Sequence, residues 1–184
     1  MQEKKQQKKQ QKKQQSPQFV SHTFPPIYDA NSRLLILGSI PSVKSREQAF
    51  YYGHPQNRFW RVLASLCKTE LPQTKEEKIQ LLRIHGIALY DTIQSCTIIG
   101  SSDSSIRDVT PADLEPIFAC AGQIPVFCNG ATSYRLYQKH LYPKTGRKAV
   151  QLPSTSPANA AWRLERLQEA WQEALGHLLL HVET

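Results

Sequence analysis

From residue 33 onward, short and continuously apolar runs alternate with longer stretches in which apolar residues recur every three or four positions. A short apolar run that ends in polar or turn residues is typical of a strand buried on both faces. Four such strands are predicted, near residues 34–37, 87–93, 124–128 and 149–152. Because strands and helices alternate through the whole body, the pattern predicts an α/β fold with a mostly parallel sheet and helices on both faces.

The longer stretches carry the start and stop signals of helices. Five helices are predicted, near residues 59–67, 74–86, 110–121, 134–141 and 164–178. Thr74 followed by Glu77 forms a capping box that opens the second helix. Thr110 followed by Pro111 predicts the start of the third, because a capping residue followed by proline is the favoured order at a helix N-terminus.

The composition divides the chain into two parts. Residues 1–15 hold six lysines and one glutamate, with no apolar side chain after Met1, and the remaining residues hold only +3 of the net charge of +8. We expect a disordered Lys/Gln-rich tail over residues 1–16 and a single domain over residues 17–184. The tail would either solubilise the protein or hold it on polyanions. The mildly basic body permits nucleic-acid binding without requiring it.

Other classes of protein are disfavoured. The four cysteines are scattered without a CxxC pair, which predicts reduced and mostly packed thiols rather than disulfides, a zinc site or an iron–sulfur cluster. They are Cys67, Cys96, Cys120 and Cys128. The N-terminus lacks the apolar core of a signal peptide, and no apolar run is long enough to span a bilayer. We therefore expect a soluble, cytoplasmic protein without a membrane partner.

Polar residues follow each predicted strand. In a parallel sheet the carboxyl ends of the strands meet at one edge, where ligands bind. Asp91 and Asn129 end two of these strands, and the loop of residues 53–60, GHPQNRFW, follows the first strand and leads into a helix. Serine-rich turns suit phosphate oxygens, and aromatic rings beside polar groups suit a nucleic-acid base. No common nucleotide-binding, hydrolase or metalloprotease motif is present.

Five segments in this order carry a resemblance to a known family. They are GSIPS (38–42), YYGHPQNRFW (51–60), ALYDTIQSC (88–96) with the following GSSDSSI, VFCNG (126–130) and LPSTSPANA (152–160). Together, over residues 33–171, they resemble the hypoxanthine-DNA glycosylases of the uracil-DNA glycosylase superfamily. The resemblance implies a three-layer α/β/α domain with a central four-stranded parallel sheet. It implies an enzyme that acts without a cofactor on DNA containing deaminated bases, flips the base out and removes chiefly hypoxanthine. We also expect a monomer.

The resemblance also implies catalytic roles. Many members of the superfamily place Asp or Asn where this chain has Ile40, and the hypoxanthine branch instead uses the Asn of its HPxN run, which matches Asn57. An amide has no useful basicity, so Asn57 would orient the attacking water. The residues alone favour Asn57 as a cap of the helix that follows, and the two roles are compatible. His54 would assist departure of the base or only brace the loop.

Further positions are expected to bind the base or the DNA backbone. Asp91 would accept the N1–H of hypoxanthine, unless it only caps a turn, and Asn129 is a weaker candidate in an ordinary Asn-Gly turn. Tyr52 and Phe59 would stack on the base, although aromatic residues at a helix start more often belong to the core. The expected phosphate contacts are Ser39, Ser154, Thr155 and Ser156. Leu152 replaces the commoner His of the last motif, which weakens any expectation of efficient uracil excision.

Two alternatives remain open at this point. A glycosylase of the same superfamily could prefer uracil or mismatched bases, because the sequence does not give the dimensions of the pocket. A non-catalytic module could hold DNA or nucleotides on the same fold, because Ile40 supplies no acid. No lysine lies in a motif in the manner of a Schiff-base nucleophile, so an active enzyme is expected to lack lyase activity.

Overall fold

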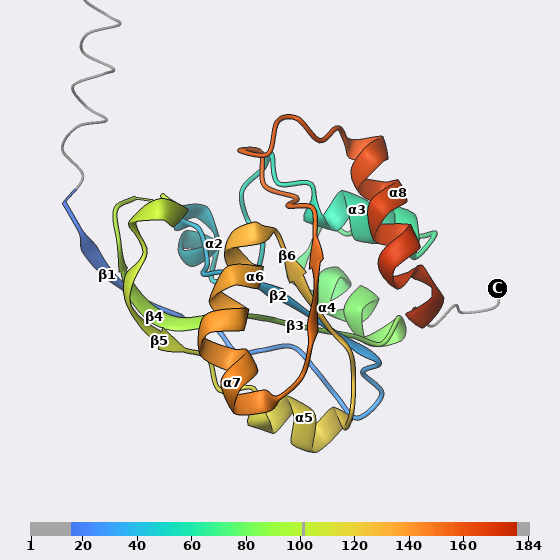
Figure 1. The fold of residues 1–184 in the computed structure, drawn as a ribbon. Coiled ribbons are helices and arrows are strands. Elements are labelled where there is room, and N and C mark those ends of the chain that lie inside the picture. The colour runs from blue at the N-terminus through green and yellow to red at the C-terminus, as the bar shows by residue number, and fades with distance from the viewer. Residues whose placement is uncertain (1–15, 101, 180–184) are drawn as a thin grey trace, which may run out of the picture.

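A parallel sheet lies at the centre of the protein. The computed structural model describes residues 16–100 and 102–179, so the predicted tail lies outside the described residues apart from Ser16. The four-stranded sheet has the order β3-β2-β6-β7, and all its pairs are parallel (Figure 1). Its strands are β2 (Leu34–Gly38), β3 (Ile87–Asp91), β6 (Val126–Asn129) and β7 (Ala149–Leu152). The predicted α/β class and the four strands are confirmed.

Helices cover both faces of this sheet, which gives the expected three layers. One face carries α5, α6, the π-helical turn η2 and α7, and the other carries α3, α4 and α8 (Figure 1). The bounds are α2 (Val43–Gln48), α3 (Phe59–Leu66), α4 (Lys75–Ile84), α5 (Glu115–Ala121), α6 (Ala131–Leu136), η2 (Tyr137–Leu141), α7 (Tyr142–Thr145) and α8 (Leu164–Leu175), with 3-10 turns η1 (Asp103–Ser105) and η3 (Gly176–Leu178). The capping box of Thr74 and Glu77 opens α4 as predicted.

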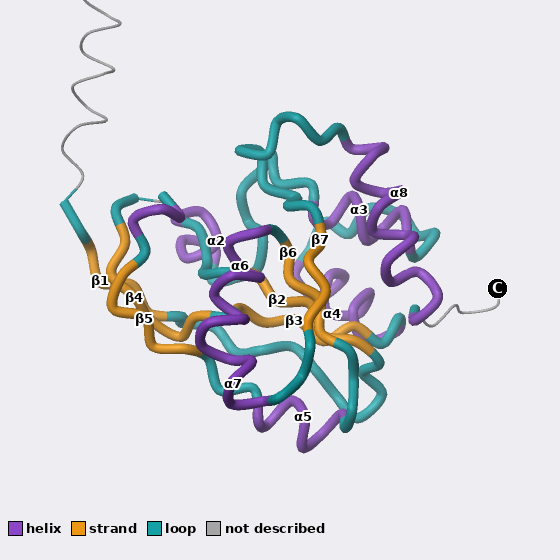
Figure 2. The backbone as a smooth tube through the Cα atoms, viewed as in Figure 1, coloured by secondary structure: helices purple, strands orange, loops and turns teal. Residues whose placement is uncertain are grey.

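The strand predicted over residues 87–93 divides into two. It ends at Asp91, and the chain continues as β4 (Ile93–Ile98) into a second, antiparallel sheet with the order β1-β4-β5 (Figure 2). This sheet also contains β1 (Gln18–Ser21) and β5 (Arg107–Pro111). The sequence pattern did not predict it, because its edge strands are mostly exposed and lack a continuous apolar run.

The predicted helix start at Thr110 and Pro111 is wrong. Both residues belong to β5, and Pro111 pairs with Ile93 at its end. An edge strand tolerates proline, because the missing amide hydrogen leaves no neighbouring strand unsatisfied. The helix α5 begins four residues later, where Asp113 Oδ1 accepts a hydrogen bond from the Glu115 amide at 3.0 Å.

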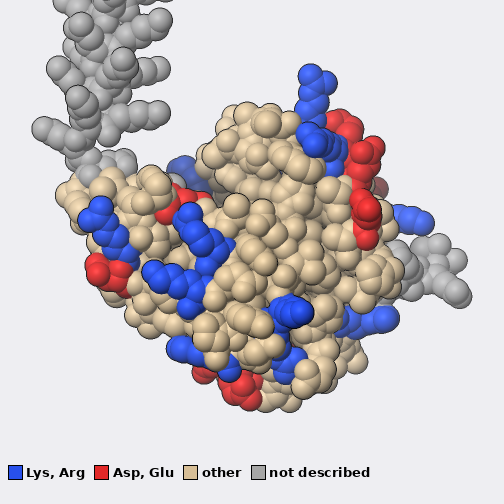
Figure 3. Space-filling model, viewed as in Figure 1, with Lys and Arg blue, Asp and Glu red and all other residues tan. Residues whose placement is uncertain are grey.

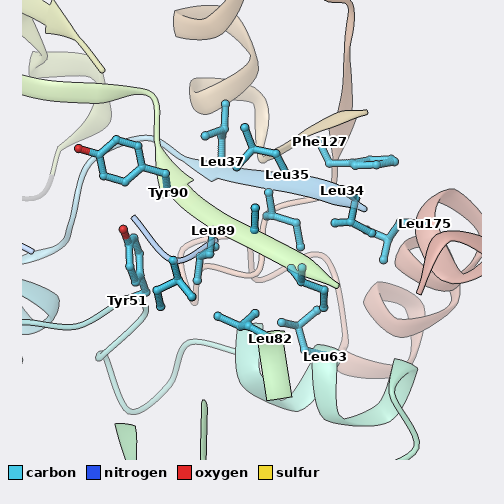
Figure 4. Close-up of a cluster of buried hydrophobic side chains, with 14 of the residues drawn as sticks. Leu34, Leu35, Leu37, Tyr51, Leu63, Leu82, Leu89, Tyr90, Phe127 and Leu175 are labelled. Atoms are coloured by element: carbon cyan, nitrogen blue, oxygen red, sulfur yellow. The ribbon is translucent and has the colours of Figure 1, made fainter. Parts of the chain in front are cut away.

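The main core lies between the parallel sheet and the helices. All five residues of β2 are buried, and leucines from α3, α4 and α8 meet the sheet (Figure 4). The four cysteines are free thiols as predicted, and three of them are buried. Burial raises the pKa of the thiols of Cys67 and Cys128 to about 12, so both stay protonated at neutral pH. Within the described parts of the chain, no helix has the length and apolarity to cross a membrane.

Candidate active site

The carboxyl ends of the parallel strands meet around one cavity. Gly38 of β2 lies opposite Asp91 of β3, and Asn129 of β6 lies opposite Leu152 of β7. A cavity of about 970 Å³ opens at this edge and is lined by the residues that follow these strands, together with residues of the loop between α2 and α3. Of the ten predicted site residues, nine line this cavity: Ser39, Tyr52, His54, Asn57, Asp91, Asn129, Ser154, Thr155 and Ser156.

The side-chain oxygen of Asn57 accepts two hydrogen bonds. Asn57 Oδ1 accepts a hydrogen bond from the Phe59 amide at 3.0 Å and one from Thr155 Oγ1 at 2.9 Å. Since a backbone amide can only donate, these contacts fix which end of the Asn57 side chain is oxygen. The Nδ2 group has no hydrogen-bond partner among the described residues, and Asn57 lines the cavity. Asn57 therefore binds the first amide of α3 from the position before the N-cap residue, Arg58, and its amide nitrogen is left as a donor for a ligand.

Thr155 connects Asn57 to Asn129. The Thr155 amide donates to Asn129 Oδ1 at 3.0 Å, and Asn129 Nδ2 donates to Thr155 Oγ1 at 2.9 Å. The Thr155 hydroxyl must then donate to Asn57, so the direction of every bond in this chain is determined. Thr155 is fully buried. Its side chain thus orders the two amides rather than reaching a phosphate, and Asn129 keeps only its second Nδ2 hydrogen for a ligand.

Arg58 holds the loop of residues 153–162 in place, a role that the sequence analysis missed. Its guanidinium donates to the carbonyls of Thr155 at 3.2 Å, Ser156 at 2.6 Å and Asn159 at 3.2 Å, and also to that of Trp162. No carboxylate pairs with Arg58 in the described chain. Nothing in the order of residues could have indicated these contacts, because all four carbonyls lie about a hundred positions away.

Asp91 is held from behind by a buried histidine that the sequence analysis also missed. His22 Nε2 lies 2.8 Å from Asp91 Oδ2, and the two side chains are 0% and 6% exposed. The other carboxylate oxygen, Oδ1, makes no hydrogen bond within residues 16–100 and 102–179. It lies against Gly38, where a Cβ would come within 2.2 Å of it. Asp91 thus faces the cavity with one free acceptor.

The two predicted stacking residues differ in position. Tyr52 lines the cavity, whereas Phe59 is fully buried and does not. The rings of Tyr52 and Phe59 stack on each other with centroids 3.8 Å apart, so Phe59 supports Tyr52 from the core. The buried Tyr52 hydroxyl makes no hydrogen bond of normal geometry among the described residues, and burial, followed by the charge of Asp91, raises its pKa, while the nearby Asn129 side chain opposes this shift. The Tyr52 hydroxyl therefore stays a donor.

The remaining predicted residues lie on the rim and walls. His54 Nδ1 accepts a hydrogen bond from the Gln56 amide at 3.1 Å, so a neutral His54 carries its hydrogen on Nε2. The hydroxyls of Ser154 and Ser156 accept bonds from backbone amides two residues ahead, which tightens this turn. Ile40 lines the cavity and also packs on the small core beside β4, so it cannot hold a water there. The described residues contain no cluster of His, Cys, Asp or Glu that could hold a metal ion.

A parallel sheet with a polar cavity at the carboxyl ends of its strands defines an α/β protein that binds a ligand at that edge. The amide, carboxylate and hydroxyl groups lining the cavity suit the edge of a nucleic-acid base. Residues 25–175 match the family model of the uracil DNA glycosylase superfamily, and the chain belongs to this superfamily.

Two of the similar proteins match over nearly their whole length, and a third matches over about half of its length. A hypoxanthine DNA glycosylase of Methanosarcina acetivorans is 30% identical over 159 residues, which are 86% of this chain and 99% of that protein. A hypoxanthine DNA glycosylase of Methanosarcina barkeri is 37% identical over 86 residues, which are 46% of this chain and 54% of that protein. The solution NMR structure of a candidate uracil DNA glycosylase from Methanosarcina acetivorans matches with a TM-score of 0.72 and 31% identity, covering 84% of this chain and 96% of that one. The family expected from the motifs is confirmed.

Proposed function

We propose that this protein is a DNA glycosylase that hydrolyses the N-glycosidic bond of deoxyinosine in DNA and releases hypoxanthine. The proposal includes a monomeric enzyme that acts in the cytoplasm without lyase activity. The similarity to two hypoxanthine DNA glycosylases supports the choice of base. The arrangement of donors and acceptors in the cavity supports it independently.

The observation that carries the proposal is the free oxygen of Asp91 in the cavity. Hypoxanthine presents an N1–H donor and an O6 acceptor on its Watson–Crick edge, whereas adenine presents an acceptor at N1. Asp91 Oδ1 is an acceptor without a partner in the described structure, and the Tyr52 hydroxyl is a donor without one. A flipped hypoxanthine would satisfy both groups, through N1–H and O6 respectively. Adenine in the same position would leave Asp91 facing the lone pair of N1.

The reaction needs little acid–base chemistry from the protein. The bond between C1′ and N9 breaks, its electron pair leaves with the purine, and positive charge develops on the sugar. A water then forms the new bond to C1′ and loses a proton, and the purine anion takes up one proton, so that neutral hypoxanthine is released. Asn57 Nδ2 would hold this water by donating to its oxygen, which leaves a second lone pair free to attack. His54 Nε2–H would donate to the departing base or to a neighbouring phosphate.

The surface around the cavity suits a DNA backbone. Ser39, Ser154 and Ser156 keep hydroxyl hydrogens that phosphate oxygens could accept. From Ala131 to Lys148 the chain contains five Lys or Arg residues and no Asp or Glu; Ala131 and Thr132 line the cavity, whereas Lys144 and Arg147 line a second cavity beside α5. Figure 3 shows Lys and Arg side chains spread over the face that α6 and α7 cover. This surface would add affinity for DNA of any sequence that weakens as salt rises.

An excision panel tests the proposal directly. Duplexes and single strands that contain one deoxyinosine, deoxyuridine, deoxyxanthosine or mismatch would be incubated with the protein and treated with alkali, which cleaves at abasic sites. We expect strand cleavage at deoxyinosine that depends on the alkali step. Faster cleavage at uracil or at a mismatch would support the alternative specificity. DNA binding without cleavage of any substrate would support a non-catalytic module.

The substitution Gly38→Ala is expected to lower hypoxanthine excision by about 10-fold or more, on the scale expected for a misplaced binding group. The new Cβ would come within 2.2 Å of Asp91 Oδ1 and 3.0 Å of the Tyr52 hydroxyl, so both groups must move. Single-turnover rates with deoxyinosine DNA measure the effect, and thermal unfolding shows whether the fold survives. Wild-type rates in a folded variant would contradict the placement of Asp91 against the base.

A further inference from the structure

We infer that His22 is a positioning residue for base recognition, which holds Asp91 at Oδ2 so that Oδ1 is aimed into the cavity. The inference rests on the proposed function, because it concerns how that pocket selects its base. His22 lies outside the motifs that carry the family resemblance, and it does not line the cavity. It acts only through Asp91.

The fold brings His22 to Asp91 by a short and rigid route. β1 pairs with β4 in antiparallel register, so Ser21 lies opposite Ser95, and the His22 amide donates to the Gln94 carbonyl at 2.8 Å. β4 begins two residues after Asp91. The pairing of β1 with β4 therefore sets the distance between the imidazole and the carboxylate. The second sheet thus has a function in the site beyond extending the fold.

The surroundings of His22 determine which of its nitrogens carries hydrogen. The ring is buried among Phe24, Tyr51 and Tyr90, whose centroids lie 4.4, 5.8 and 4.9 Å away. His22 Nδ1 is buried and has no partner among the described residues. A hydrogen on Nδ1 would be a buried donor without an acceptor, which is costly. The neutral tautomer with hydrogen on Nε2 avoids this cost and donates to Asp91 Oδ2 at 2.8 Å.

This arrangement has a consequence for base selection. A carboxylate that is held at one oxygen keeps its plane, whereas a carboxylate without this contact can rotate about its terminal side-chain bond. A rotated Asp91 would no longer present Oδ1 to the N1–H of hypoxanthine. The hydrogen bond from His22 to Oδ2 fixes the plane of the carboxylate, so that Oδ1 stays aimed into the cavity. The preference for hypoxanthine over adenine would thus depend on a residue that does not touch the base.

The test compares three variants with the wild type. His22→Leu removes the donor and keeps an apolar side chain among the aromatic rings, whereas His22→Gln keeps a donor at a similar reach. His85→Leu is the matched control, because it removes another buried imidazole that does not line the cavity. Single-turnover excision of hypoxanthine is measured together with affinity for a duplex that carries a tetrahydrofuran abasic-site analogue, which lacks a base.

We expect His22→Leu to lower the excision rate by on the order of 10- to 100-fold, as for a misplaced recognition group. His22→Gln should regain most of this loss. Affinity for the tetrahydrofuran duplex should be the same in all variants, and His85→Leu should leave the rate of hypoxanthine excision unchanged. A wild-type rate in folded His22→Leu would overturn the inference. If this variant does not fold, His22→Asn, whose amide ends short of Asp91, takes its place.

A double-mutant cycle separates positioning from general stabilisation. If His22 acts through Asp91, the loss from His22→Leu should vanish in an Asp91→Asn background, because the group that it positions is already changed. Independent, multiplying losses would overturn the inference. A wild-type protein that excises uracil or xanthine but not hypoxanthine would instead refute the proposed substrate. The same cycle measured on the base that is excised would then test His22 separately.

Discussion

Asn57→Ala is expected to lower the single-turnover rate of hypoxanthine excision by on the order of 100-fold or more, because an unplaced nucleophile forfeits the advantage of orientation. Asn57 Oδ1 is held by the Phe59 amide and by Thr155 Oγ1, so the direction of Nδ2 is fixed before any ligand binds. Alanine removes this donor together with the cap of α3. Loss of a cap costs about 1 kcal/mol of stability, which is too little to unfold a typical domain.

Asn57→Asp separates the two ends of the amide. Aspartate can still accept from the Phe59 amide and from Thr155, so the cap and the loop contact survive, but it has no hydrogen to donate. We expect Asn57→Asp to be nearly as slow as Asn57→Ala while unfolding close to the wild-type temperature. Gln56→Ala changes an exposed neighbour in the same loop and is the control. Full activity in Asn57→Asp would show that the oxygen, acting as an acceptor or base, orients the water instead.

The pattern of apolar residues predicted the parallel sheet because its strands are buried on both faces. Runs such as residues 34–37 are continuously apolar, so they lack the spacing of polar residues that would indicate a helix or a half-exposed strand. The second sheet escaped prediction because β1 and β5 are edge strands with few buried side chains. Its consequence for the site also escaped prediction, since His22 reaches Asp91 only through the pairing of β1 with β4.

The sequence predicted those residues of the candidate site that lie at the ends of the parallel strands. Asp91 and Asn129 end their strands, and the topology of a parallel sheet brings such ends together. Contacts between loops follow no such rule. Thr155 was expected at a phosphate because it lies among serines, yet it is the buried link between two amides. Phe59 was expected on the base, but the helical spacing that places it in α3 also directs it into the core.

The substitution Arg58→Met is expected to lower both stability and DNA affinity. The guanidinium bonds four carbonyls of the loop of residues 153–162, and methionine would leave them without these donors. Hydrogen bonds to a charged group contribute about 1.5–3 kcal/mol each and do not add fully, so we expect a loss of about 3 kcal/mol in the free energy of unfolding. Denaturant unfolding measures this loss. Affinity for the tetrahydrofuran duplex should fall about 10-fold, the equivalent of roughly 1.4 kcal/mol.

Two further variants show whether the effect of Arg58 on stability and DNA affinity comes from the geometry of its guanidinium or from its charge. Arg61→Met removes the same charge from an exposed position three residues further along, in α3, and should change neither unfolding nor specific affinity by more than about 0.5 kcal/mol. Arg58→Lys keeps the charge, but its single ammonium cannot span carbonyls from four residues as a planar guanidinium does. We expect Arg58→Lys to recover only part of the lost stability and affinity. If Arg58→Lys matched the wild type, charge alone would hold this loop against Asn57, and the fork of the guanidinium would have no role in shaping the cavity.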